Sequence, residues 1–119
     1  MTTRSSKTMR AAGGDPAATD LRVFAELWIS LASLLRSYTA AHGLHNNRHA
    51  RVESGEDRIT VRHESKWLRL ERKGEIVTWT RENRSCGSIV ISEAGRLRNG
   101  LREEEMDMAA EAWARELMQ

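Results

Sequence analysis

Between Arg58 and Arg81, apolar and polar side chains alternate through three short segments that are separated by polar turns. A period of two is the pattern of a β-strand that has one buried face and one face in water. Strands joined by short turns run antiparallel, because a parallel partner requires a long crossover connection. This stretch therefore predicts an antiparallel meander with one solvated face.

The alternation assigns each side chain to a face of the predicted sheet. The inward set comprises Ile59, Val61 and His63 in the first segment, Leu68 and Leu70 in the second, and Val77 and Trp79 in the third. Lys73-Gly74 is typical of a hairpin turn. Residues 49–54 and 88–92 are further candidate strands, and residues 81–88 are expected to form a loop. The prediction is a meander of four or five strands.

A helix is predicted on the N-terminal side of the meander. The apolar residues that recur at helical spacing are Leu21, Phe24, Leu27, Trp28, Leu31, Leu34, Leu35 and Tyr38. Asp20 is a suitable N-cap, and Gly43 is expected at the C′ position in the left-handed conformation. The apolar arc of this helix is wide. Either the helix is clasped on two sides, or its second flank is buried in another subunit.

A second helix is predicted from Leu101 onward, after a linker at residues 93–100. Its first turns contain Glu103, Glu104, Glu105 and Asp107, and the helix dipole favours negative charge there. Its expected inward stripe is Met106, Ala110, Trp113 and Leu117. The whole order predicts an α+β two-layer sandwich over residues 20–119, in which both helices pack on the sheet. Residues 1–19 are expected to be a disordered tail.

This order of elements is similar in outline to frataxin-like domains and to small secretion-chaperone-like α+β domains. The similarity is limited to topology, because no motif is shared. The acidic first-helix surface of the frataxin type is missing, since residues 21–43 contain one acid, Glu26. The resemblance implies a fold and assigns no site residue.

Charge is distributed unevenly along a chain whose formal net charge is only +2. Residues 48–84 contain ten Lys or Arg against seven acids, whereas residues 101–119 contain two against six. Arg62, Trp67 and Arg69 share the predicted wet face, where they could stack bases and contact phosphates. Glu64 and Glu71 are expected on the same face, and ordinary cross-strand ion pairs are the alternative interpretation.

Three groups of residues are candidates for a metal or catalytic site, and the sequence supports each of them weakly. His42, His45 and His49 would share a face only if the first helix continued past Gly43, so a metal site is not predicted. His63 is expected to be a packing residue, because a catalytic base would need convergent partners. Cys86 lies in a predicted loop beside Arg84, without a recognisable Cys–His motif. We therefore predict no catalytic, metal or cofactor residue, and the sequence leans against an enzyme.

The leading functional hypothesis is a non-enzymatic protein-interaction module that self-associates, as a homodimer, or binds another protein. Its candidate interface is Leu27, Trp28, Leu31, Leu34 and Leu35. A nucleic-acid-binding domain that uses Arg62, Trp67 and Arg69 is the alternative, and a small enzyme or a histidine-dependent metal-binding protein is a third hypothesis, ranked below both. One cysteine and no secretory signal predict a cytoplasmic location. No membrane partner is expected, because the apolar run 23–35 is interrupted and too short to span a bilayer.

Overall fold

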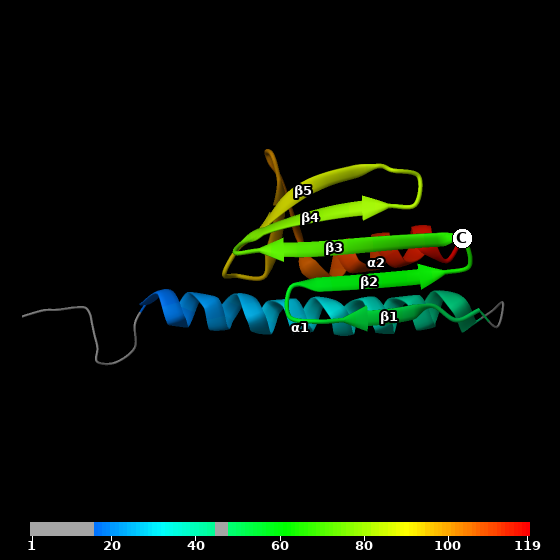
Figure 1. The fold of residues 1–119 in the computed structure, drawn as a ribbon, viewed down its shortest axis with the longest axis horizontal. Helices are drawn as coiled ribbons and strands as arrows, with labels where there is room; N and C mark the ends of the chain where they lie inside the picture. The colour runs from blue at the N-terminus through cyan, green and yellow to red at the C-terminus, as the bar shows by residue number, and fades with distance from the viewer. Residues whose placement is uncertain (1–15, 45–47) are drawn as a thin grey trace, which may run out of the picture.

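The computed structural model describes residues 16–44 and 48–119 as a two-layer α+β fold (Figure 1). Its one sheet is an antiparallel meander of β1 (Arg51–Ser54), β2 (Arg58–His63), β3 (Lys66–Lys73), β4 (Ile76–Arg81), β5 (Cys86–Ile91), β6 (Arg96–Asn99) and β7 (Arg102–Glu105). Two helices, α1 (Pro16–Gly43) and α2 (Met106–Leu117), pack against each other and cover one face. The predicted fold class is confirmed, but the sheet has seven strands and not four or five.

The register of the central strands is the one that the alternation predicts. Val61 lies opposite Leu68, Leu70 opposite Trp79, and Val77 opposite Ile89. The buried residues of these strands face the helices, since side chains of paired residues point to the same side of a sheet. The opposite face of the sheet carries no helix, and we call it the open face (Figure 1).

The wide apolar arc of α1 is clasped on two sides within the single chain. Trp28, Leu31 and Leu35 are buried, and Leu27 and Leu34 are half-buried against the same core. The core is completed by sheet residues and by Met106, Ala110 and Leu117 of α2. The buried stripe of α2 includes Ala114, whereas Trp113 is only half-buried. The sheet and α2 thus account for the width of the arc without a second subunit.

Both ends of α1 differ from the prediction. The helix begins at Pro16, four residues before Asp20, and proline suits the first helical turn because its missing N–H is not needed there. Gly43 is the last helical residue and has no positive φ. A Cβ at this position would overlap the carbonyl oxygen of Arg48, whose N–H donates to the Gly43 carbonyl at 2.9 Å. Close approach, and not a left-handed backbone, requires glycine. Residues 1–15 of the expected tail lie outside the described part.

The C-terminal third corrects the prediction most strongly. Residues 93–100 are not a linker, because they contain β6, and residues 102–105 are not helical, because they form β7. Arg96 explains the pairing: its guanidinium lies 3.3 Å from a carboxylate oxygen of Glu103 and 3.6 Å from one of Glu105. The glutamates therefore serve cross-strand ion pairs, and α2 begins only at Met106. Within residues 16–44 and 48–119, no helix is long and apolar enough to cross a bilayer.

Candidate nucleic-acid interface

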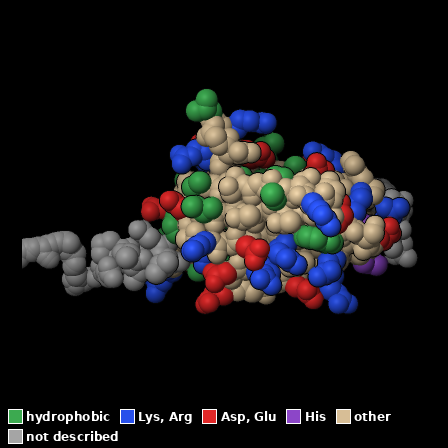
Figure 2. Space-filling model, turned by 45° about the horizontal axis from the view of Figure 1, so that its top comes forward, with side chains coloured by type: hydrophobic (Ala, Val, Ile, Leu, Met, Phe, Trp, Pro, Cys, Tyr) green, Lys and Arg blue, Asp and Glu red, His purple; other side chains and the backbone are tan. Residues whose placement is uncertain are grey.

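The open face of the sheet carries charged and small polar side chains. Figure 2 shows Lys and Arg interspersed with Asp and Glu over this side of the molecule, with hydrophobic side chains in separate small groups. Strand register sorts them into rows that run across the strands. One row consists of Arg51, Arg62 and Trp67, and the next consists of Glu53, Thr60, Arg69, Thr80 and Cys86. Basic and aromatic side chains therefore meet at one end of the open face.

The structure brings Arg62, Trp67 and Arg69 together, as their shared face predicts. Arg62 is the direct cross-strand partner of Trp67. The Arg69 guanidinium lies 5.3 Å from the centroid of the Trp67 ring, within the range of a cation–π contact. Trp67 is half-buried, so a part of its side-chain surface is open to solvent. We call these three residues, together with Arg51, the Arg–Trp cluster.

Arg51 was missed in the sequence because the pairing of β1 was not assigned. It is the cross-strand partner of Arg62, so two like charges lie directly opposite each other. The alternation of β1 could have placed Arg51 on the open face. Val52 faces the helices, so the adjacent Arg51 must face the other way. Like-charged partners destabilise a sheet. Their presence at this end is therefore not accounted for by stability.

Carboxylates compensate four of the other arginines of the sheet but not the Arg–Trp cluster, and Arg98 and Arg102 of the β6–β7 hairpin likewise have no carboxylate oxygen within 4.0 Å among the described residues. Arg58, Arg72, Arg81 and Arg96 each have a carboxylate partner, and Arg58 lies 3.1 Å from Glu71. Among the described residues, no carboxylate oxygen lies within 4.0 Å of the Arg51, Arg62 or Arg69 guanidinium. Three arginines without a close carboxylate therefore surround Trp67.

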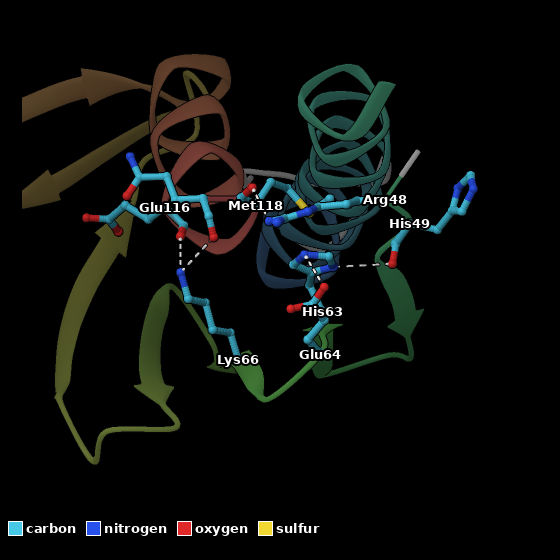
Figure 3. Close-up of polar contacts among 8 residues, drawn as sticks. Arg48, His49, His63, Glu64, Lys66, Glu116 and Met118 are labelled. Atoms are coloured by element: carbon cyan, nitrogen blue, oxygen red, sulfur yellow. Dashed lines mark hydrogen bonds and ion pairs between the residues drawn. The ribbon is translucent and has the colours of Figure 1, made fainter. Parts of the chain in front are cut away.

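The two glutamates expected to neutralise this face do not lie in the cluster. Glu71 is engaged by Arg58 toward the other end of β3. Glu64 lies in the β2–β3 turn at φ 57 and directs a carboxylate oxygen to within 3.7 Å of the His63 ring (Figure 3). Glu82 accepts the backbone N–H of Trp67 at 3.0 Å, and Glu53 lies two residues from Arg51 on the open face of β1, so two acids stand near the three arginines. The local balance thus remains basic.

His63 lies on the covered face, as its alternation predicts, and is buried at the end of β2. Its Nδ1 donates to the carbonyl oxygen of His49 at 3.4 Å, while the His49 imidazole is directed away (Figure 3). Among the described residues Nε2 has no hydrogen-bond partner, and the nearby carboxylate oxygen of Glu64 lies 3.7 Å from it.

Two cations beside His63 hold the C-terminal end of α2. The Lys66 ammonium donates to the carbonyl oxygens of Glu116 and Gln119 at 3.3 and 3.2 Å (Figure 3). Arg48 donates to the Met118 carbonyl at 3.5 Å. Carbonyl groups at a helix C-terminus lack helical donors and attract cations. This cluster therefore anchors α2 to the sheet.

The histidine segment does not assemble a metal site among the residues that can be described. Because α1 ends at Gly43, the helical alignment of its imidazoles is lost. His42 Nε2 donates to a carboxylate oxygen of Glu111 in α2 at 2.7 Å, and the His49 side chain is exposed. His45 lies outside the described residues. No group of three metal-ligating side chains occurs in the described ranges.

Cys86 is an exposed free thiol at the start of β5, and not in a loop. Its register with Thr80 places it on the open face, whereas His63 is on the covered face. A Cys–His pair between them is therefore impossible in this fold, because the sheet separates the two side chains.

The proposed interface residues of α1 point mostly into the protein's own core. Trp28, Leu31 and Leu35 are each at most 2% exposed, so a partner could not reach them without unfolding the chain. Among the α1 side chains that the structure describes, the large apolar residue exposed to solvent is Ile29, at 67% exposure. The packing does not support self-association through the five predicted residues.

Comparisons with protein-family models, with curated proteins and with solved structures find no match to this chain.

Proposed function

We propose that the chain is a non-enzymatic binding module that holds single-stranded nucleic acid on the open face of its sheet, at the Arg–Trp cluster. The observation that carries this proposal is that Arg51, Arg62 and Arg69 surround a half-buried Trp67 and have no carboxylate partner among the described residues. A guanidinium binds phosphate oxygens in bidentate fashion, and an indole provides a stacking surface for a base.

A single strand fits this surface better than a duplex. Bases stack on an aromatic ring only when they are unpaired, and a sheet face with basic and aromatic side chains offers both contacts in one plane. The neighbouring row adds Thr80, a half-buried small polar residue that leaves the backbone of a nucleic-acid strand room to approach, whereas Thr60 in the same row is buried. Major-groove readout normally inserts a helix or a β-ribbon, and both helices here pack on the other face.

Oligonucleotide binding tests the proposal directly. A fluorescently labelled single strand should show increased anisotropy with the full chain at low salt, and the affinity should fall as salt rises, because bound phosphates release counterions. Trp67→Ala should weaken binding by roughly 5- to 150-fold, the equivalent of about 1–3 kcal/mol for one lost stacking contact. Arg69→Ala should also reduce the magnitude of the logarithmic salt slope by about 0.7 for a single strand.

Arg58→Ala is the matched control. It removes the same charge from the same face, but its guanidinium is engaged by Glu71, away from the cluster. Affinity should therefore change little. No binding at low salt, or equal losses for Arg58→Ala and Arg69→Ala, would remove the basis for the proposal. A preference for duplex would show that Trp67 does not stack on a base.

We also place this module in the cytoplasm. The support is chemical: Cys86 is free and exposed, and an unpaired thiol suits a reducing compartment.

A further inference from the structure

A cavity of about 420 Å³ lies on the covered side of the sheet, between α2 and the β6–β7 hairpin, and we call it the α2 groove. Its volume falls in the range of cavities that hold small ligands, about 300–1,000 Å³. The hairpin leads directly into Met106 at the start of α2, so the two walls of the groove are joined at one end (Figure 1). The sheet separates this groove from the Arg–Trp cluster on the open face.

Small residues of α2 leave room for the groove. Ala109, Ala112 and Trp113 all line it, and residues three and four apart lie on the same face of a helix. An alanine side chain ends at its Cβ, so the helix wall is set back beside the Trp113 ring. Larger side chains at the two alanine positions would fill this space.

Trp79 supplies a second aromatic wall from β4. It is paired with Gly87 of β5, and a Cβ built on Gly87 would lie 2.8 Å from three atoms of the indole. The ring therefore lies across β5 at the position that has no side chain. Trp79 and Trp113 are both half-buried, so a part of each side chain remains accessible to a ligand. The buried side chains of Ile89 and Leu97 complete an apolar floor.

One cation and one anion line the groove from β7. Arg102 and Glu104 are exposed and lie two residues apart, so their side chains leave the same face of the strand about 7 Å from each other. Within the described chain, no oppositely charged group lies within 4.0 Å of either side chain. Glu103 and Glu105 differ, because they lie on the other face of β7 and pair with Arg96. The groove thus offers separate positive and negative groups above an apolar floor.

An ion pair occupies the groove toward the C-terminal end of α2. Glu116 lines the groove and pairs with the Arg81 guanidinium, which also lies 5.8 Å from the centroid of the Trp79 ring. Both charges at this end are therefore compensated. A ligand that matches the groove carries an anionic group for Arg102, a cationic group for Glu104 and an apolar part for the floor.

We propose that the α2 groove binds a free α-amino acid with an aromatic side chain. Arg102 holds the α-carboxylate, Glu104 holds the α-ammonium group, and the aromatic ring packs against Trp79 and Trp113. The charges select this class of ligand: a phosphate or a simple carboxylate would be repelled by Glu104, and a simple amine would leave Arg102 without a partner. The site is separate from the one proposed for nucleic acid, because it lies on the other side of the sheet.

Nuclear magnetic resonance titration of the isotope-labelled full chain with L-phenylalanine tests the site through the indole N–H signals of the four tryptophans. The signals of Trp79 and Trp113 should shift and saturate together. Those of Trp67, on the open face, and of the buried Trp28 should stay in place. Hydrocinnamate lacks the ammonium group and phenethylamine lacks the carboxylate. Each should bind about fivefold more weakly than phenylalanine, because one charged contact at an exposed rim is lost.

Two variants assign the charged contacts. Arg102→Gln should weaken phenylalanine binding about fivefold without weakening phenethylamine binding, and Glu104→Gln should weaken phenylalanine binding to the same extent without weakening hydrocinnamate binding. Arg98→Gln is the matched control. It removes an arginine that also lacks a close carboxylate from the same hairpin, but on the open face, and should leave phenylalanine binding unchanged.

Three results would each overturn the proposal: no saturable shift of the Trp79 and Trp113 signals, equal affinity for phenylalanine and either analogue, or equal effects of Arg98→Gln and Arg102→Gln. Oligonucleotide binding at Trp67 is measured separately, so none of these results bears on the nucleic-acid proposal.

Discussion

Gly43 is the residue at which α1 comes closest to the segment that enters β1. The sequence predicts a left-handed glycine, but the packing requires glycine for a different reason: any Cβ would meet the Arg48 carbonyl oxygen. The sequence therefore predicts correctly that the helix ends at a glycine. The reason that glycine is needed is a contact with Arg48, which only the folded chain brings close.

Gly43→Ala should lower the free energy of unfolding by up to about 2 kcal/mol, because an overpacking cost of about 1–3 kcal/mol is offset by a gain of about 1 kcal/mol in helix propensity. Urea denaturation measures the change. Gly55→Ala is the control, since the atom nearest to its added Cβ is 3.9 Å away and its φ is not positive. Equal stability of the two variants would show that the Arg48 segment can move aside freely.

Some residues of the Arg–Trp cluster could likewise be predicted from the sequence, and others could not. Arg62, Trp67 and Arg69 could be placed on one face because a period of two is a local property of the sequence. The inclusion of Arg51 and the removal of Glu64 could not be predicted, because they depend on the β1–β2 register and on the direction of a turn side chain.

At the scale of elements, strong patterns were predicted correctly and weak ones were not. The strands β2 to β4 alternate clearly and bury one face. β6 offers one buried apolar residue, Leu97, and β7 offers none, so neither has the pattern of a half-buried strand. The glutamates of β7 are typical of a helix N-terminus, and the sequence therefore predicts a helix there. In the structure, two of them form ion pairs with Arg96 across the hairpin.

The contact between α1 and α2 includes a hydrogen bond from His42 to Glu111 at 2.7 Å, in which both side chains are about two-thirds buried (31% and 30% exposed). A double-mutant cycle with His42→Ala and Glu111→Ala should give a coupling energy of about 0.2–1 kcal/mol, typical of partly exposed pairs.

Arg115 provides the comparison for this cycle. It also contacts Glu111, at 2.9 Å, but from within α2, so a cycle between Arg115 and Glu111 reports helix stability and not helix docking. If the His42 cycle gave no coupling, the bond would make no contribution to the docking of α1 on α2.

At the scale of the whole molecule, one hydrophobic core joins α1, the sheet and α2. Residues of α1, the sheet and α2 belong to a single buried cluster, so no part of the described chain has a core of its own. The predicted architecture followed from element order, since two helices that flank a meander have one economical arrangement. The width of the α1 arc left two possibilities open, and the packing of α2 against α1 decides between them.

Unfolding should therefore be a single cooperative transition. Tryptophan fluorescence, to which Trp28, Trp79 and Trp113 contribute from the core, and far-ultraviolet circular dichroism should give the same denaturation midpoint. A loss of helical signal before the fluorescence change would mean that α1 or α2 detaches from a sheet that remains folded, and that the core is not one unit.

The pairing of the first helix with the last also has a consequence for synthesis of the protein. During translation α1 leaves the ribosome first, while α2, which covers one flank of its apolar arc, is made last. Until then Trp28, Leu31 and Leu35 lack their complete surroundings, and transiently exposed apolar surface of this kind promotes aggregation. A nascent chain truncated before Met106 should consequently engage chaperones that bind apolar segments, and release should follow once α2 has emerged.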